Sequence, residues 1–136
     1  MKQNTKLKRE CISGKYIDEK GELLNKRAVG RIGEKMAREY LLQQGYFIVK
    51  MNYSCKIGEI DIIASKRDVI VFVEVKYRKN SSFGVSFEAV DRKKQYKIRN
   101  VAEYYITYEL EKTDVNCRFD VIGIDNGNIT HIENAF

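Results

Sequence analysis

Two short apolar runs carry ionisable residues at positions where buried strands normally carry Val or Ile. The first run (GEIDIIA) contains Glu59 and Asp61, and the second (VFVEVK), after a short polar break, contains Glu74 and Lys76. Charges seldom lie in such runs unless another group pairs with them. Side chains alternate between the faces of a strand, so Glu59 and Asp61 are expected to share a face, as are Glu74 and Lys76. If the strands are neighbours, three carboxylates and an ammonium converge, which suits a divalent cation and a phosphate.

Charge and composition narrow the class of partner. The chain has 136 residues, enough for one domain with a real core, and a net charge of +6. That charge fits an anionic partner, either nucleic acid or an acidic membrane surface, and of the two we expect nucleic acid. No apolar window is long enough for a membrane-spanning helix. Three widely spaced cysteines exclude a disulfide framework and argue against a zinc site. We therefore expect a cytoplasmic protein with reduced thiols.

The single histidine, His131, has no nucleophile motif beside it. A Ser-His-Asp or Cys-His enzyme is therefore not indicated, and His131 is interpreted as a strand residue.

The chain divides into a leader and a core. Residues 1–27 are polar and basic, which predicts a disordered or loosely attached arm, and a basic arm that follows phosphates is the functional alternative. Residues 28–136 are expected to form one domain.

Hydrophobic periodicity predicts the order helix, three strands, helix, two strands. Gly45 is a suitable end for the first helix, Glu88 and Asp91 suit the start of the second, and Asn126-Gly127 is a strong hairpin signal. The connections among the first three strands are short, so these should form an antiparallel meander. The fold class is α/β, a mixed sheet flanked by helices. The predicted helices cover residues 28–44 and 87–110, and the predicted strands cover 46–53, 59–65, 69–77, 119–125 and 129–132.

This order, with an acid on the second strand and Glu-x-Lys on the third, resembles the restriction-endonuclease-like PD-(D/E)xK nuclease superfamily. Within it, the chain looks most similar to the YraN family (UPF0102), relatives of Holliday-junction resolvases. The matching segments are GRIGE at 30–34, GEIDIIA at 58–64, residues 71–78, FEAVD at 87–91, CRFDV at 117–121 and HIENAF at 131–136. The chain departs from the superfamily name at Ile60-Asp61, where proline is absent. That proline shapes the strand, so Asp61 is kept as the equivalent acid.

The resemblance implies a metal-dependent endonuclease that hydrolyses DNA, with branched DNA as a candidate substrate and a homodimer as a candidate assembly. Asp61, Glu74 and the carbonyl of Val75 are then the ligands of Mg²⁺ or Mn²⁺. Lys76 orients the attacking water or stabilises the phosphate. The alternative from the residues alone is a structural salt bridge between Lys76 and Glu74 or Asp61.

Three further polar residues are candidates for the edge of this site. Glu34 lies at the edge of the first helix's apolar face and could reach the metal, the alternative being a solvated residue. Glu59 is expected to support the metal ligands without binding the ion, and Gln95 to contribute a polar group from the second helix.

Basic residues crowd the second helix and the end of the Glu-x-Lys strand. They predict a phosphate-contacting rim, whereas a solvated helix face is the alternative. Three classes remain open: a metal-dependent nuclease, a nucleic-acid-binding protein without turnover, and a scaffold with a structural charge cluster. The residues of the predicted rim are Arg78, Lys79, Arg92, Lys93, Lys94, Lys97 and Arg99.

Overall fold

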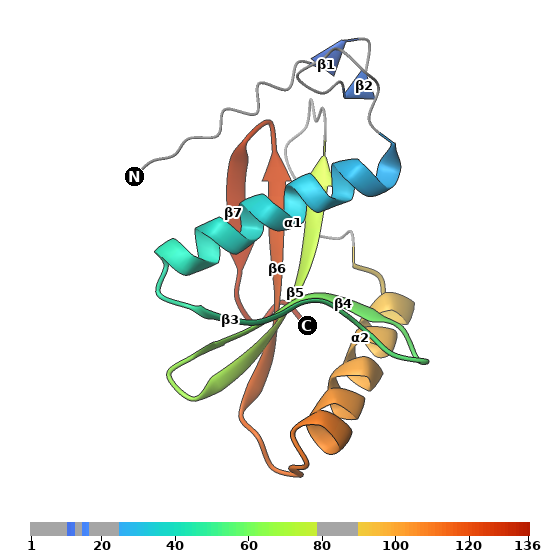
Figure 1. Cartoon of the computed structure of the whole chain (residues 1–136), viewed down its shortest axis with the longest axis vertical. Helices are drawn as coiled ribbons and strands as arrows, with labels where there is room; N and C mark the ends of the chain where they lie inside the picture. Colours follow the sequence, from blue (N-terminus) through green and yellow to red (C-terminus); the bar gives the residue numbers. More distant parts are fainter. Residues whose placement is uncertain (1–10, 13–14, 17–24, 79–89) are drawn as a thin grey trace.

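The computed structural model describes residues 11–12, 15–16, 25–78 and 90–136 (Figure 1). Its α/β order is the predicted one, preceded by a pair of two-residue strands within the segment expected to be an arm. In the described part of the chain, no helix has the length and apolar character needed to cross a membrane. The elements are β1 (Cys11–Ile12), β2 (Lys15–Tyr16), α1 (Lys26–Gln43), β3 (Phe47–Ser54), β4 (Glu59–Lys66), β5 (Val69–Arg78), α2 (Arg92–Tyr104), a π-helical turn (Tyr105–Glu109), β6 (Cys117–Asp125) and β7 (Asn128–Ile132).

The main sheet has the strand order β3-β4-β5-β6-β7. The predicted meander is confirmed, because β3, β4 and β5 pair antiparallel. β6 then pairs parallel to β5, and α2 forms the crossover connection that parallel strands require. The hairpin between β6 and β7 is confirmed too: Asn126 and Gly127 have φ angles of 52° and 81°, as a type I′ turn demands.

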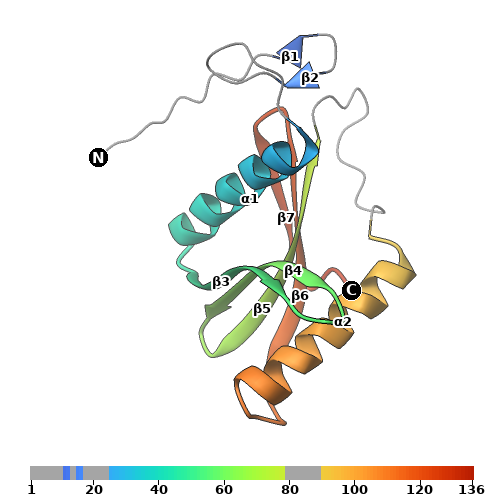
Figure 2. The ribbon, with the colours of Figure 1, turned by 45° about the vertical axis from the view of Figure 1, so that its right-hand side comes forward.

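The two faces of the sheet are covered by different helices, as two views of the ribbon show (Figures 1 and 2). Ala37 and Leu41 of α1 pack against Ile62, Val73 and other residues on one face. Ile98 and Val101 of α2 pack on the opposite face, in a cluster that includes Phe72 and Tyr105. The central strands are therefore buried on both faces, which explains their near-continuous apolar sequence.

Local capping explains where the helices begin and end. Asn25 caps α1 by accepting a hydrogen bond from the Ala28 amide at 2.8 Å, so the helix begins at Lys26, two residues before the predicted start. Gly45 ends it in a left-handed conformation (φ +88°), as predicted.

The predicted start of the second helix near Phe87 is wrong. Residues 87–89 lie outside the described residues, but Val90 and Asp91 are described and are not helical. Asp91 is the N-cap, with its carboxylate accepting from the Lys94 amide at 2.8 Å, so α2 begins at Arg92.

Strand β4 departs from strict alternation at its N-terminal end. Ile60 and Ile63 pack in the α2-side core, whereas Ile62, only two residues after Ile60, packs in the α1-side core. On the paired strand, Asn52 is in a left-handed conformation (φ 53°) at the level of Asp61. The expectation that Glu59 and Asp61 share a face rested on unbroken alternation, which Ile60 and Ile62 do not follow.

Candidate active site

Asp61 lies where the backbone pairing of β4 with β5 ends. The last described pair is Ile62 with Val73. At the residue before Ile62, a side-chain contact replaces the backbone pairing. Oδ2 of Asp61 accepts a hydrogen bond from the backbone N–H of Val75 at 2.8 Å. Asp61 is thereby held against β5, beside Glu74, with which its carboxyl group interacts directly.

Glu74 is a buried carboxylate between two lysines. Its side chain is 6% exposed. Its Oε2 lies 3.0 Å from Nζ of Lys94 on α2 and 3.8 Å from Nζ of Lys76 on its own strand. The prediction that Glu74 and Lys76 share a face is met, and α2 supplies a second ammonium to the same carboxylate.

The two carboxylates perturb each other. Burial, followed by the negative charge of Glu74, raises the pKa of Asp61 to about 7, against the lowering effect of the Val75 amide. Burial alone would lower the pKa of Lys94, but Glu74, Asp61 and Glu59 raise it overall. The carboxylates concentrate negative charge at this site, and the neighbouring ammonium groups offset that charge only in part.

Glu34 reaches the same charge cluster from α1. Burial raises its pKa, a hydrogen bond with Asn52 opposes that shift, and the charges of Glu59 and Glu74 add to it. The close approach of α1 to the sheet depends on Gly33, where a Cβ atom would lie 2.7 Å from Cβ of Tyr77. Glu34 is therefore a half-buried neighbour of the site, rather than a solvated helix residue.

The donor set fits a hard divalent cation. Mg²⁺ is commonly bound through one or two carboxylates, with water and substrate oxygens completing its shell. Asp61 and Glu74 supply such a pair, and a cation would relieve the repulsion that raises the pKa of Asp61. Within the described residues, no three or more His, Cys, Asp or Glu side chains are gathered as a metal site, so an ion here would depend on the pair. The Val75 carbonyl stays a predicted ligand, since the contact described for Val75 is through its amide.

The predicted supporting residues fall in different places. Glu59 is exposed and lines a pocket with Glu34 and Asn52. Gln95 donates from Nε2 to the carbonyl of Val90 at 2.9 Å, so its amide nitrogen is bonded to the backbone that precedes its own helix.

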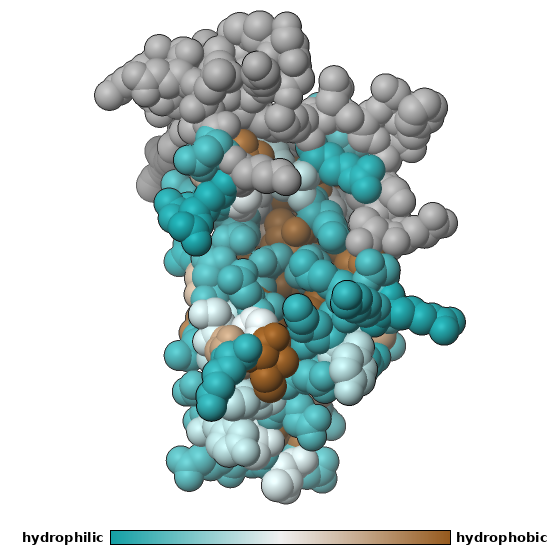
Figure 3. Space-filling model, turned by 90° about the vertical axis from the view of Figure 1, so that its right-hand side faces the viewer, coloured by the Kyte–Doolittle hydropathy of each residue, from teal (hydrophilic) through white to brown (hydrophobic). Residues whose placement is uncertain are grey.

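The residues predicted to form a basic rim lie in several different environments. Lys94 contacts Glu74 and belongs to the site itself. Arg99 lies over the rings of Phe119 and Phe136, at 4.8 and 5.8 Å from their centroids. Arg92, Lys93 and Lys97 are exposed on α2, Arg78 is half-buried at the end of β5, and Lys79 lies outside the described residues. The side of the molecule that faces right in Figure 1, where α2 lies, is mainly hydrophilic (Figure 3).

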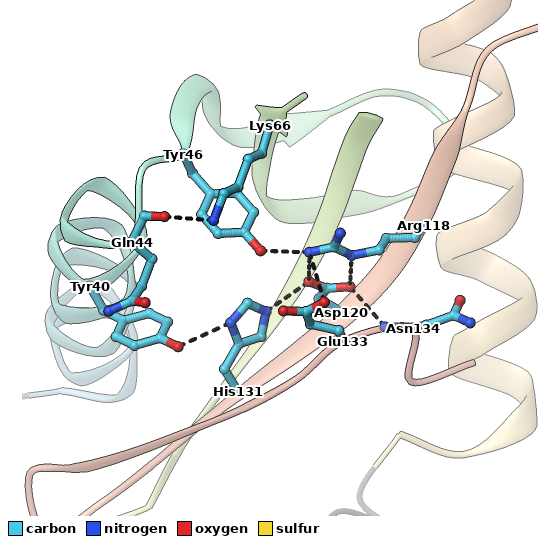
Figure 4. Close-up of polar contacts among 9 residues, drawn as sticks. All are labelled: Tyr40, Gln44, Tyr46, Lys66, Arg118, Asp120, His131, Glu133 and Asn134. Atoms are coloured by element: carbon cyan, nitrogen blue, oxygen red, sulfur yellow. Dashed lines mark hydrogen bonds and ion pairs between the residues drawn. The ribbon is translucent and has the colours of Figure 1, made fainter. Parts of the chain in front are cut away.

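A second charged cluster lies on the opposite face of the sheet, around Asp120 (Figure 4). Asp120 is fully buried. It accepts hydrogen bonds from Arg118 at 2.9 and 3.0 Å and from the Asn134 amide at 3.0 Å, and His131 Nε2 lies 2.7 Å from its Oδ2. Tyr40 of α1 contacts the other ring nitrogen of His131 at 3.2 Å. The cluster ties α1, β6, β7 and the C-terminal segment together.

Sequence reasoning missed this cluster and the role of Lys94. The signal for the cluster was present, because Arg118 and Asp120 alternate with apolar residues in the same manner as Glu74 and Lys76. Lys94 carried no such signal, since a lysine on a basic helix face looks like its neighbours until the helix is placed on the sheet.

Comparisons with known proteins place the chain among close relatives. Residues 33–124 match the model of "Uncharacterised protein family UPF0102". A UPF0102 protein of Clostridioides difficile is 49% identical, with 83% of this chain and 100% of the relative covered. One from Caldicellulosiruptor bescii is 46% identical, with 80% and 94% covered. A solved structure, SfsA of Pyrococcus furiosus in complex with Ca²⁺, is similar at a TM-score of only 0.30 and 14% identity, over 89% of this chain and 67% of that chain.

Proposed function

The chain belongs to the UPF0102 family, and we propose that it is a divalent-metal-dependent endonuclease acting on DNA. One observation carries the proposal: the carboxylates of Asp61 and Glu74 meet at the splayed end of two strands, with the ammonium groups of Lys76 and Lys94 beside them. Buried like charges raise the energy of a fold, and such arrangements concentrate at functional sites.

In this proposal, the residues of the site have different roles in phosphodiester hydrolysis. A divalent ion held by Asp61 and Glu74 would activate a water and stabilise charge on the phosphate. Lys76, 3.8 Å from Glu74 and partly exposed, is placed to contact a phosphate oxygen or orient the water. Lys94 holds the Glu74 carboxylate in place from α2. Glu34, held by Asn52, adds a third carboxylate at the rim.

The alternative is a nucleic-acid-binding protein without turnover. The contact that favours it is the 3.0 Å ion pair between Lys94 and Glu74, which satisfies the carboxylate with no metal. A Mg²⁺ ion and the Lys94 ammonium would compete for the same carboxylate oxygens of Glu74. The strength of the Lys94–Glu74 pair therefore decides between the two functions. No base-reading motif accompanies the site, which favours selection of DNA by its structure, branched DNA included. The homodimer implied by resolvase relatives stays a prediction.

The test is cleavage and metal binding measured together. Purified protein is incubated with linear, nicked and four-way-junction DNA, and with RNA, in Mg²⁺ or Mn²⁺. Asp61→Ala and Glu74→Ala should abolish cleavage and leave DNA affinity intact or slightly higher, because each carboxylate repels phosphate. Lys76→Ala should abolish cleavage and weaken binding modestly. Glu103→Ala, at an exposed carboxylate of α2, is the matched control and should behave as wild type.

The catalytic assignment is wrong if wild type cleaves no form of DNA or RNA and Asp61→Ala leaves divalent-ion binding unchanged by calorimetry. The non-catalytic binding function would then stand.

A further inference from the structure

A polar pocket of about 470 Å³ opens beside the carboxylate site, between α1 and the β3–β4 hairpin. It is lined on the helix side by Arg27, Gly30 and Arg31, and on the sheet side by residues including Asn52 and Ser54. Glu34 and Glu59 also line it, and the charge of Glu34 is coupled to those of Glu74 and Asp61. The pocket therefore adjoins the candidate active site and shares Glu34 with it.

The helix side of the pocket is suited to an anion. Arg27 and Arg31 are four residues apart on α1, so their side chains leave the helix on the same face. Both are exposed, and no salt bridge within 4 Å is found for either in the described part of the chain, although the positive charge of Arg31 lowers the pKa of Glu34 in the same pocket. Guanidinium groups bind phosphate oxygens through two parallel N–H donors, and two of them one turn apart form a compact phosphate cradle.

The lining also indicates which part of a nucleic acid would enter. None of the described residues that line the pocket is aromatic, so these residues offer no surface on which a base would stack. Asn52 and Ser54 supply hydrogen-bonding side chains, as a sugar–phosphate unit requires. The volume lies in the range of pockets that enclose small ligands and accommodates one such unit.

We propose that this pocket binds the backbone phosphate of a nucleotide adjacent to the scissile one, with Arg27 and Arg31 as its contacts. The proposal rests on the proposed function for the substrate class, DNA, and extends it to α1. The DNA strand then crosses from the lysines of α2, past Glu74 and Asp61, to the arginines of α1. The basic rim predicted from sequence covered only the α2 side of this path.

Gly30 provides an uncharged way to close the pocket. A Cβ atom at Gly30 would meet nothing within 4 Å, so the space beside the helix is open. Leu is a better helix former than Gly, hence Gly30→Leu should fill the pocket while keeping α1 intact.

The test is DNA affinity in EDTA, where cleavage plays no part. A fluorescein-labelled single-stranded 30-mer and a four-way junction are titrated by anisotropy over a range of KCl concentrations. The Arg27→Gln/Arg31→Gln double variant should weaken binding and reduce the salt slope by about 1 to 2, as loss of one or two phosphate contacts predicts. Gly30→Leu should weaken binding at an unchanged net charge. The matched control is Lys35→Gln/Arg38→Gln, which removes the same charge from exposed positions of α1 that do not line the pocket.

Equal losses for the two double variants would overturn the proposal, since only long-range charge would then be at work. Wild-type affinity in Gly30→Leu would overturn it as well. Circular dichroism and thermal unfolding confirm that each variant is folded. Because the readout is binding without metal, failure of the pocket is distinct from failure of the nuclease assignment, which depends on cleavage and on the Asp61 and Glu74 variants.

Discussion

Asp61 shows how a single side chain can serve the backbone and a reactive site together. Its Oδ2 completes the hydrogen bonding of β5 at the Val75 amide, where β4 itself has separated from the ladder. The same position brings its charge beside Glu74 in a buried environment. Ionised Asp61 therefore supports local geometry while opposing the stability of the metal-free fold.

Asp61→Asn should stabilise the metal-free protein at pH 8. The amide retains an oxygen for the Val75 N–H and removes the repelled charge. Because the folded-state pKa of Asp61 is raised to about 7, its unfavourable contribution grows as pH rises from about 4 to 7 and is full above that. We expect a gain of about 2–4 kcal/mol in the free energy of unfolding at pH 8 and none at pH 4, by urea unfolding in EDTA.

Asp114→Asn, at an exposed position, is the control for Asp61→Asn and should change little. A loss of stability in Asp61→Asn at pH 8 would identify Asp61 as a favourable ion-pair partner, which is the structural salt-bridge alternative.

Asp120→Asn should have the opposite effect. Although burial opposes it, hydrogen bonds from His131, Arg118 and the Asn134 amide hold the pKa of Asp120 below its usual value. The ionised group therefore stabilises the fold above the unfolded pKa near 4, and that contribution is lost as pH falls through the lower folded-state value. We expect a loss of about 3–5 kcal/mol at pH 7, as when one partner of a buried ion pair is removed.

Unfolding curves measured between pH 3 and 8 should give wild type and Asp120→Asn similar free energies of unfolding only at the acidic end of this range. Since the cluster lies on the face opposite Glu74, DNA affinity of the folded variant should equal that of wild type. A stability equal to wild type at pH 7 would show that the Asp120 cluster does not hold the fold together.

At the scale of elements, the site depends on how closely α1 approaches β5. Gly33 faces Tyr77 with no room for a side chain, and this contact places the next residue, Glu34, within reach of the carboxylates. Gly30, one turn earlier, faces open space. Two glycines of one helix thus have different roles, and only Gly33 is required for packing.

Gly33→Ala and Gly30→Ala form a matched pair that tests this difference. The new Cβ at position 33 would lie 2.7 Å from Cβ and Cδ2 of Tyr77, so α1 must shift, at a cost of about 1–3 kcal/mol. The same change at position 30 should stabilise by about 0.5–1 kcal/mol, because Ala is the better helix former. Chemical denaturation measures both, and destabilisation of the two by equal amounts would contradict the packing argument.

At the scale of the whole molecule, excess positive charge is presented from both helices around an acidic centre. The net charge of +6 is not spread evenly, since Lys93 and Lys97 are exposed on α2 while Arg27 and Arg31 are exposed on α1. Such a distribution attracts a polyanion to the surface and leaves the acids to act only at close range.

Charge reversal on α2 should weaken DNA binding with a marked dependence on salt. Lys93→Glu/Lys97→Glu is expected to reduce affinity and flatten the slope of log affinity against log salt, because each lost phosphate contact removes released counterions. Lys112→Glu, at an exposed position after the helix, is the control for charge alone. If the DNA affinity of the wild-type protein does not depend on salt concentration, the basic face of α2 is a solvated helix surface and not a DNA-binding surface.

The sequence by itself determined the order of the elements, the antiparallel pairing of β3, β4 and β5, and the β6–β7 hairpin. Helical and alternating patterns, Gly45 and Asn126-Gly127 are local signals, and local signals determine local geometry. It also marked Asp61, Glu74 and Lys76, because a charge within an apolar strand is conspicuous without any structure.

Only the tertiary structure decided which groups meet. Nothing local to Lys94 sets it apart from Lys93, yet the docking of α2 on the sheet brings it 3.0 Å from Glu74. The same holds for Glu34 with Asn52, and for Asp120 with His131, which come from separate elements. Likewise, Ile60 and Ile62 pack in different cores, which no pattern of period two reveals. Contacts between distant segments depend on how whole elements pack, and the sequence near each residue carries no record of that packing.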